Sequence, residues 1–232
     1  MDYLRFPKTP HLMWLGVGAP RDDKVISPED AAELLLHVLV VEEKIDGANI
    51  GISLGDRDEL RVQNRGAFLA WDSLHPQFKP LPRWIETHRR VLTDALRPEL
   101  ILFGEWCYAM HSVHYTRLPD WFIAFDIYDR AFGKFWSVER RDAFTDQVGL
   151  ATAPRVARGK FEAEGMKELI GRSRFADGPA EGIYVRWDRG EFLERRAKLV
   201  QPEFTQSISE HWSRGPLRLN RLLVTGQEMR AR

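Results

Sequence analysis

The chain is poor in cysteine: Cys107 is the only one among its 232 residues. A single thiol excludes an intramolecular disulfide and a cysteine-cluster metal site. The chain also lacks a net charge, because 34 basic residues balance 34 acidic ones. Any site for a polyanion must therefore be a local patch. No apolar run approaches membrane-spanning length, and the N-terminal residues lack the apolar core of a signal peptide, so we expect a cytoplasmic protein without a membrane partner.

The sequence has the composition of an ordinary globular protein, with 44% hydrophobic and 29% charged residues. Its length allows a sizeable core. Capping serines and apolar periodicity predict helices from Ser27 to about 37, over 82–97, from Ser137 to about 148, and over 163–174. Strands are expected before Lys44 and over 50–54, 60–64, 99–105, 121–128, 181–186 and 192–200. Hairpin signals between them indicate an α+β fold of mostly antiparallel sheets with flanking helices.

One polar stretch carries a lysine between two of the expected strands: Glu43-Lys44-Ile45-Asp46-Gly47-Ala48-Asn49. A lysine at the mouth of such a unit can be desolvated, which disfavours its ammonium form and leaves a nucleophilic amine. Gly47 leaves room for a phosphate beside the backbone, and Asn49 offers an amide to a ligand. Taken alone, the pattern also fits a solvated hairpin turn, since Asp-Gly is a common turn dipeptide.

Charged residues also mark the ends of other strands: Glu105, Glu181 and Lys198, with Phe125 at a fifth strand end. A nucleotide-binding site needs these residue types. A lysine attacks the α-phosphate, carboxylates hold a metal, cations stabilise the transition state, and an aromatic ring stacks on the base. The same sequence pattern would also arise if the carboxylates were ordinary strand-end residues and the phenylalanine belonged to the core.

In order and spacing, these segments resemble the motifs of the covalent nucleotidyltransferases, which are the DNA ligases, RNA ligases and mRNA capping enzymes. The matching segments are Lys44 to Gly47 for motif I, Arg65 for Ia, Phe103 to Glu105 for III, Phe125 to Tyr128 for IIIa, Glu181 to Ile183 for IV and Arg196 to Lys198 for V. Within the superfamily the chain is most similar to the RNA ligase 2-like branch, because Asn49 follows motif I and the segments 6–12 and 108–122 look like those of small members.

This resemblance implies a nucleotidyltransferase (ATP-grasp-like ligase adenylation) domain over 1–204, followed by a short, basic, helical extension over 205–232. It implies three catalytic residues: Lys44, which would form lysyl-AMP, Glu181 and Lys198. It implies nucleotide contacts from Glu43, Asn49, Arg65, Glu105, Phe125 and Arg196. It implies a Mg or Mn ion held by Asp46, Glu105 and Glu181.

Three departures affect this assignment. The branch commonly has lysine where this chain has Arg196, and a planar guanidinium is not equivalent to an ammonium. Arg61 lies on the same hairpin as Arg65 and competes for the motif Ia role. The segment after Lys198 is too short for an OB-fold, and the segment before Lys44 is too short for an NAD-binding domain, so ATP is the expected cofactor.

The resemblance therefore implies an ATP-dependent RNA ligase that joins 3′-OH and 5′-phosphate ends through lysyl-AMP and an adenylylated 5′-phosphate. Its expected partner is RNA with nicked or broken ends. Three alternatives stay open: a ligase for DNA or mixed nicks, a non-catalytic module that binds nucleic-acid ends, and a nucleotidyltransferase with a protein target. His111 and His114, without a third nitrogen or sulfur ligand nearby, predict a loop or a substrate-facing role rather than a metal site.

Overall fold

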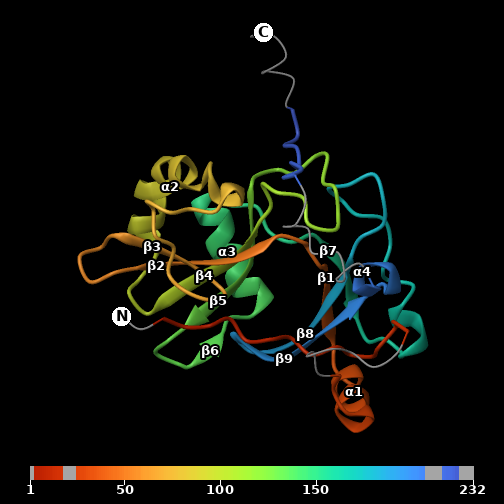
Figure 1. The fold of residues 1–232 in the computed structure, drawn as a ribbon. Coiled ribbons are helices and arrows are strands. Elements are labelled where there is room, and N and C mark those ends of the chain that lie inside the picture. Colours follow the sequence, from red (N-terminus) through yellow and green to blue (C-terminus); the bar gives the residue numbers. More distant parts are fainter. Residues whose placement is uncertain (1–2, 18–24, 207–215, 225–232) are drawn as a thin grey trace.

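Two antiparallel sheets lie side by side in the computed structural model, which describes residues 3–17, 25–206 and 216–224 (Figure 1). Sheet A has the order β7 (Arg155–Gly159), β1 (Leu39–Glu43), β8 (Gly182–Arg189) and β9 (Phe192–Val200). Sheet B has the order β3 (Leu60–Asn64), β2 (Ala48–Leu54), β4 (Leu100–Trp106), β5 (Phe122–Asp129) and β6 (Lys134–Phe135). With helices around them, these sheets confirm the predicted α+β fold.

The helices begin where the sequence supplies a cap. Ser27 caps α1 (Pro28–Leu35) by accepting from the Asp30 amide, and Ser137 caps α3 (Val138–Val148) in the same way. The remaining helices are α2 (Leu81–Ala95), the short α4 (Pro202–Gln206), and 3₁₀ turns at Pro76–Phe78 and Glu164–Met166. Within the described ranges, no helix is long and apolar enough to cross a membrane.

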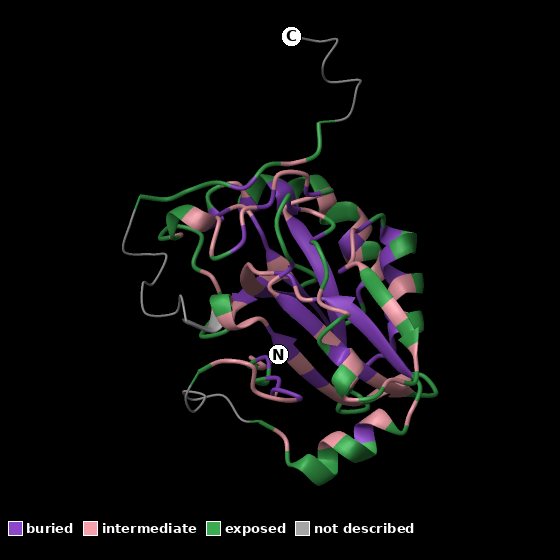
Figure 2. Cartoon of the chain, turned by 90° about the vertical axis from the view of Figure 1, so that its right-hand side faces the viewer, coloured by how far each residue is buried: buried purple, intermediate pink, exposed green. Residues whose placement is uncertain are grey.

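Three apolar clusters hold these layers together, and buried residues run along the strands (Figure 2). The first packs α2 and α3 against one face of sheet B, and the third covers the outer face of sheet A next to α1. The second lies between the sheets and includes Phe6, Phe103, Ile123 and Phe125. Because the outer face of sheet A takes the apolar residues of β1, β8 and β9, their polar residues face sheet B.

The polar stretch around Lys44 does not close a hairpin. β1 belongs to sheet A and β2 to sheet B, so this stretch carries the chain from one sheet to the other. The Lys44 amide donates to the Gly182 carbonyl at 2.9 Å. A Cβ at Gly47 would lie 2.9 Å from the Trp106 carbonyl oxygen, so the glycine allows close approach to β4 and does not reserve space for a phosphate.

The helix predicted over 163–174 is wrong, and the helical extension predicted over 205–232 is described only in part, with α4 reaching Gln206. Over 163–174 only Glu164–Met166 is helical, because Gly165 and Gly171 weaken the helix and the residues after 171 bond elsewhere. The expected helical extension over 205–232 is not found in 216–224, which are extended along the loop at 108–118. Residues 207–215 and 225–232 of that extension lie outside the described residues.

Candidate active site

Lys44 and Glu181 meet at the junction of the two sheets. Lys44 Nζ lies 2.5 Å from Glu181 Oε2, and their side chains are only 15% and 12% exposed. Lys44 follows the last residue of β1, and Glu181 precedes β8, the strand paired with β1. The paired strands therefore fix two residues that are far apart in the sequence as a half-buried ion pair.

The charge state of Lys44 is opposite to the one that desolvation alone predicts. Burial lowers the pKa of Lys44, but the neighbouring Glu181, Tyr184, Asp46 and Glu105 outweigh it and raise the pKa above its ordinary value. The amine is therefore held as an ammonium in the free protein. The expectation of a neutral lysine was wrong because it counted burial and not the anions around it.

Glu105 brings a carboxylate with an unsatisfied oxygen to the same place. Among the described residues, its buried Oε2 has no hydrogen-bond partner. Burial raises the pKa of Glu105 well above its ordinary value, although the Lys44 and Arg65 cations oppose the shift. Burial likewise raises the pKa of Glu181 to about 7. Two buried acids that bind protons this readily fit a divalent cation with oxygen ligands.

Asp46 does not complete a ready-made metal site with these two acids. Its Oδ2 accepts hydrogen bonds from the backbone amides of Ser112 at 2.6 Å and Val113 at 3.1 Å. Its own amide donates to the Tyr115 hydroxyl at 2.8 Å. In the described part of the chain, no group of three acids, histidines or cysteines is arranged to hold a metal. Asp46 is thus tied to the neighbouring loop, whereas Glu105 keeps an oxygen without a hydrogen-bond partner among the described residues.

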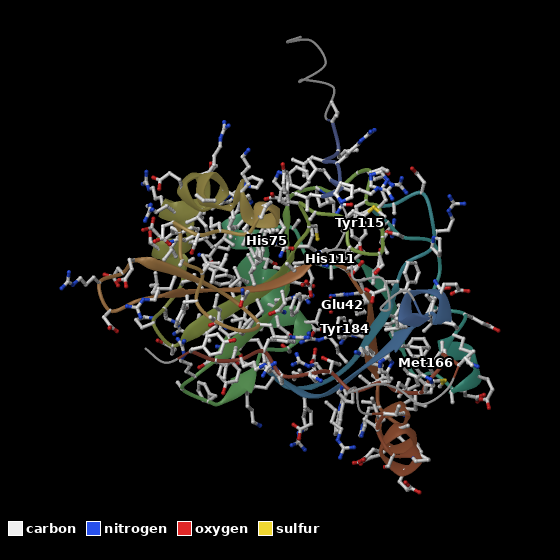
Figure 3. All side chains as sticks on the ribbon, in the orientation of Figure 1. Glu42, His75, His111, Tyr115, Met166 and Tyr184 are labelled. Atoms are coloured by element: carbon white, nitrogen blue, oxygen red, sulfur yellow. The ribbon has the colours of Figure 1, made fainter. Side chains whose placement is uncertain are left out.

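A small pocket lies between the two sheets. Phe6 and Phe125 from one side and Tyr184 and Arg196 from the other are among its lining residues. Its lining residue Glu42 pairs with Tyr184 and precedes Lys44 by two residues, so the pocket lies near the end of β1 from which Lys44 follows. Figure 3 shows Tyr184 and Glu42 in the middle of the molecule, between the sheets. The open volume of this pocket is only about 10 Å³, which is room for one water molecule, so a nucleobase would enter between the aromatic walls only after side chains moved.

The Arg196 guanidinium lies between aromatic rings rather than beside Lys44. Its central carbon is 4.5 Å from the Phe6 ring centre and 4.4 Å from the Phe135 ring centre, and Nη1 donates to Asp126. Arg186 Nη1 donates to the other Asp126 oxygen at 2.6 Å. Arg196 thus lines the pocket, and Lys198 is the motif V residue that interacts electrostatically with Glu181.

The other predicted nucleotide contacts divide into two groups. Asn49 pairs in register with Glu105, and Arg65 is close enough to Glu105 to lower its pKa, so both lie at the site. Arg61 bonds to Glu59 near the turn of the hairpin, away from Glu105. Glu43 is buried and accepts from Ser173 Oγ at 2.5 Å and the Arg174 amide at 2.9 Å, so its carboxylate holds that segment.

The sequence did not reveal the buried charged residues that line the pocket or their partner Arg141. Arg141 donates two hydrogen bonds to the Glu42 carboxylate, at 2.6 and 3.1 Å, and a third to the Phe125 carbonyl at 2.8 Å. The signal was available in part. Glu42 and Arg186 are charged residues within predicted strands, and with Tyr184 they lie on one face of the sheet.

Replacing Arg141 with methionine is expected to lower the free energy of unfolding by about 3–5 kcal/mol, because Glu42 would stay buried without its main partner. Chemical denaturation monitored by circular dichroism measures this. The matched control is Arg158→Met, which removes an exposed pair with Glu139 and should cost about 0–1 kcal/mol. Equal effects of the two substitutions would contradict a stabilising role for the buried pair.

Comparisons with known proteins identify the family of this chain. The family model described as RNA ligase matches residues 37–200. The chain belongs to the RNA ligase family. That match includes every motif from Lys44 to Lys198. A search of curated protein sequences gives no match.

Solved structures of an RNA ligase from Naegleria gruberi share the fold of this family member. A lysine-to-alanine variant with ATP and Mn is similar at a TM-score of 0.66 and 16% identity, covering 87% of this chain and 57% of that chain. The complex with PPi has a TM-score of 0.61 at 17% identity, covering 78% of this chain and 55% of that chain. This chain therefore spans little more than half the length of those ligases.

Proposed function

We propose that this RNA ligase family member is an ATP-dependent RNA ligase that works through a covalent lysyl-AMP. The observation that supports this best is the ion pair of Lys44 and Glu181, next to the unsatisfied Glu105 oxygen and an aromatic-walled pocket. In such a site the base would lie against Phe125 and Tyr184, and the α-phosphate would lie near Lys44 and Lys198.

In the first step, Lys44 Nζ attacks the α-phosphorus of ATP. A phosphorus–nitrogen bond forms, the bond to the bridging oxygen breaks, and pyrophosphate leaves with the electron pair. The ammonium must first lose a proton. Glu181 Oε2 lies 2.5 Å away and is placed to receive that proton.

Glu105 and Glu181 would hold a magnesium or manganese ion. When bound, such an ion offsets the charge of the phosphates and of the leaving pyrophosphate. Asn49 and Arg65 flank Glu105 and would contact the sugar and phosphates. Glu43 is left out of this set, because both of its oxygens are engaged by Ser173 and Arg174.

In the later steps, AMP passes from Lys44 to a 5′-phosphate end, and a 3′-hydroxyl displaces it to form the phosphodiester. The proposed substrate is RNA with nicked or broken ends, in keeping with the family. A matched panel of RNA, DNA and mixed nicks tests this preference. Faster sealing of DNA nicks than of RNA nicks would reject RNA as the preferred substrate, but it would not contradict the adenylylation step.

The first step is tested by incubating the purified chain with α-labelled ATP or GTP and Mg or Mn, followed by denaturing electrophoresis. We expect a labelled protein band with ATP and none with GTP. Labelling only by GTP would assign guanylyl transfer instead. No label with either nucleotide, from folded protein stripped of bound nucleotide, would leave a binding fold without the activity.

A further inference from the structure

The segment at 216–224 is paired with the loop that follows β4. Its backbone bonds to this loop at several points: the Met110 amide donates to the Arg218 carbonyl at 2.9 Å, and the Arg221 amide donates to the Tyr115 carbonyl at 2.9 Å. Further along, the Leu223 amide donates to the Leu118 carbonyl at 2.8 Å. The segment therefore runs along the length of the loop.

Asn220 lies at the centre of this pairing and is 3% exposed. Its Oδ1 accepts from the Tyr115 amide at 2.9 Å, and its Nδ2 donates to the carbonyls of Cys107 at 2.8 Å and Ala109 at 3.1 Å. One side chain thus joins the beginning of the loop to its far side. A hydrophobic side chain there would leave three buried backbone groups without partners.

The same loop holds Asp46 in place beside Lys44. The amides of Ser112 and Val113 both donate to Asp46 Oδ2, and the Tyr115 hydroxyl accepts from the Asp46 amide. The Ser112 and Val113 amides lie in the loop between the residues that Asn220 joins, Ala109 and Tyr115. The third group, the hydroxyl, belongs to Tyr115 itself. Figure 3 shows Tyr115 and His111 together on this loop, above the space between the sheets.

We infer that Asn220 is a positioning residue for adenylylation: by fixing the loop at 107–115 it sets Asp46, and through the motif I backbone it sets Lys44. This inference rests on the proposed function for its kinetic readout. It assigns to the C-terminal segment a part in the first step, where the sequence predicted only a basic helical extension.

The test compares Asn220→Ala and Asn220→Asp with Arg221→Ala, an exposed neighbour whose backbone bonds to Tyr115 and Leu118. With labelled ATP in single turnover, Asn220→Ala is expected to lower the maximal rate about 10-fold. The half-saturating ATP concentration should change little, because Asn220 is not among the pocket residues. Asn220→Asp keeps the acceptor for Tyr115 and should recover part of the rate. Arg221→Ala should match the native chain.

Hydrogen exchange supplies a readout that needs no activity. The Ser112 and Val113 amides should exchange faster in Asn220→Ala and not in Arg221→Ala. If Asn220→Ala does not fold, Tyr115→Phe removes the hydroxyl that holds the Asp46 amide and should give the same rate loss. Native exchange and native rate in a folded Asn220→Ala would overturn the inference. Absence of labelling in the native chain would reject the proposed function, and exchange would still decide the role of Asn220.

Discussion

Replacing Lys44 with alanine is expected to abolish the labelled adduct with ATP, a loss of at least about 10³-fold in single turnover. Lys44 is the amine that the two sheets fix beside Glu181, and the pocket that would hold the base lies near the end of β1 from which Lys44 follows.

Two further variants separate the nucleophile from the ion pair. Lys44→Arg keeps a cation for Glu181 but stays protonated, so it should fold normally and give no adduct. Lys79→Ala changes an exposed lysine and should label like the native chain. A labelled adduct that persists in Lys44→Ala or Lys44→Arg would remove Lys44 from its proposed role and point to a different amine.

Local patterns were sufficient to predict most elements of this fold. The strand predicted over 192–200 has the bounds of β9, and the strands predicted over 50–54 and 60–64 form the β2–β3 hairpin. Ser27 and Ser137 marked two helix starts, because a capping hydroxyl acts within its own turn. These features depend only on residues that are close together in the sequence, so local patterns are enough to predict them.

Long-range arrangement was not predictable in the same way. β1 and β2 are adjacent in the chain but belong to different sheets, since β1 is paired with β8 and β2 with β4. The segment after Gly171 read as a helix, yet Ser173 and Arg174 bind the Glu43 carboxylate from far along the chain. Such choices depend on which partner a strand or an acid finds in three dimensions.

The sequence predicted which residues come together at the site better than it predicted their charge states. Lys44, Glu105 and Glu181 come together as the motifs implied. The sequence could not show that Asp46 would be held by the amides of Ser112 and Val113, or that several anions would keep Lys44 charged. Burial and the number of nearby charges are properties of the folded chain, and they decide the direction of a pKa shift.

Replacing Glu181 with glutamine is expected to have two opposite effects on adduct formation. Because Lys44 is held as an ammonium, the rate in the native chain should rise with pH as the free amine becomes available. Removing the Glu181 anion lowers the pKa of Lys44, so the rise should begin at lower pH. The maximal rate should nevertheless fall about 10²-fold, because a metal ligand and proton acceptor is lost.

Single-turnover labelling across a pH series measures both effects, with Asp94→Asn as a control that changes an exposed acid. A lower maximum with an unchanged pH midpoint would mean that Glu181 acts on the metal or the fold and does not set the charge of Lys44. A shifted midpoint with a native maximum would mean the reverse. The predicted combination follows from one geometry, because a carboxylate 2.5 Å from Nζ both retains the proton on the amine and is placed to receive it.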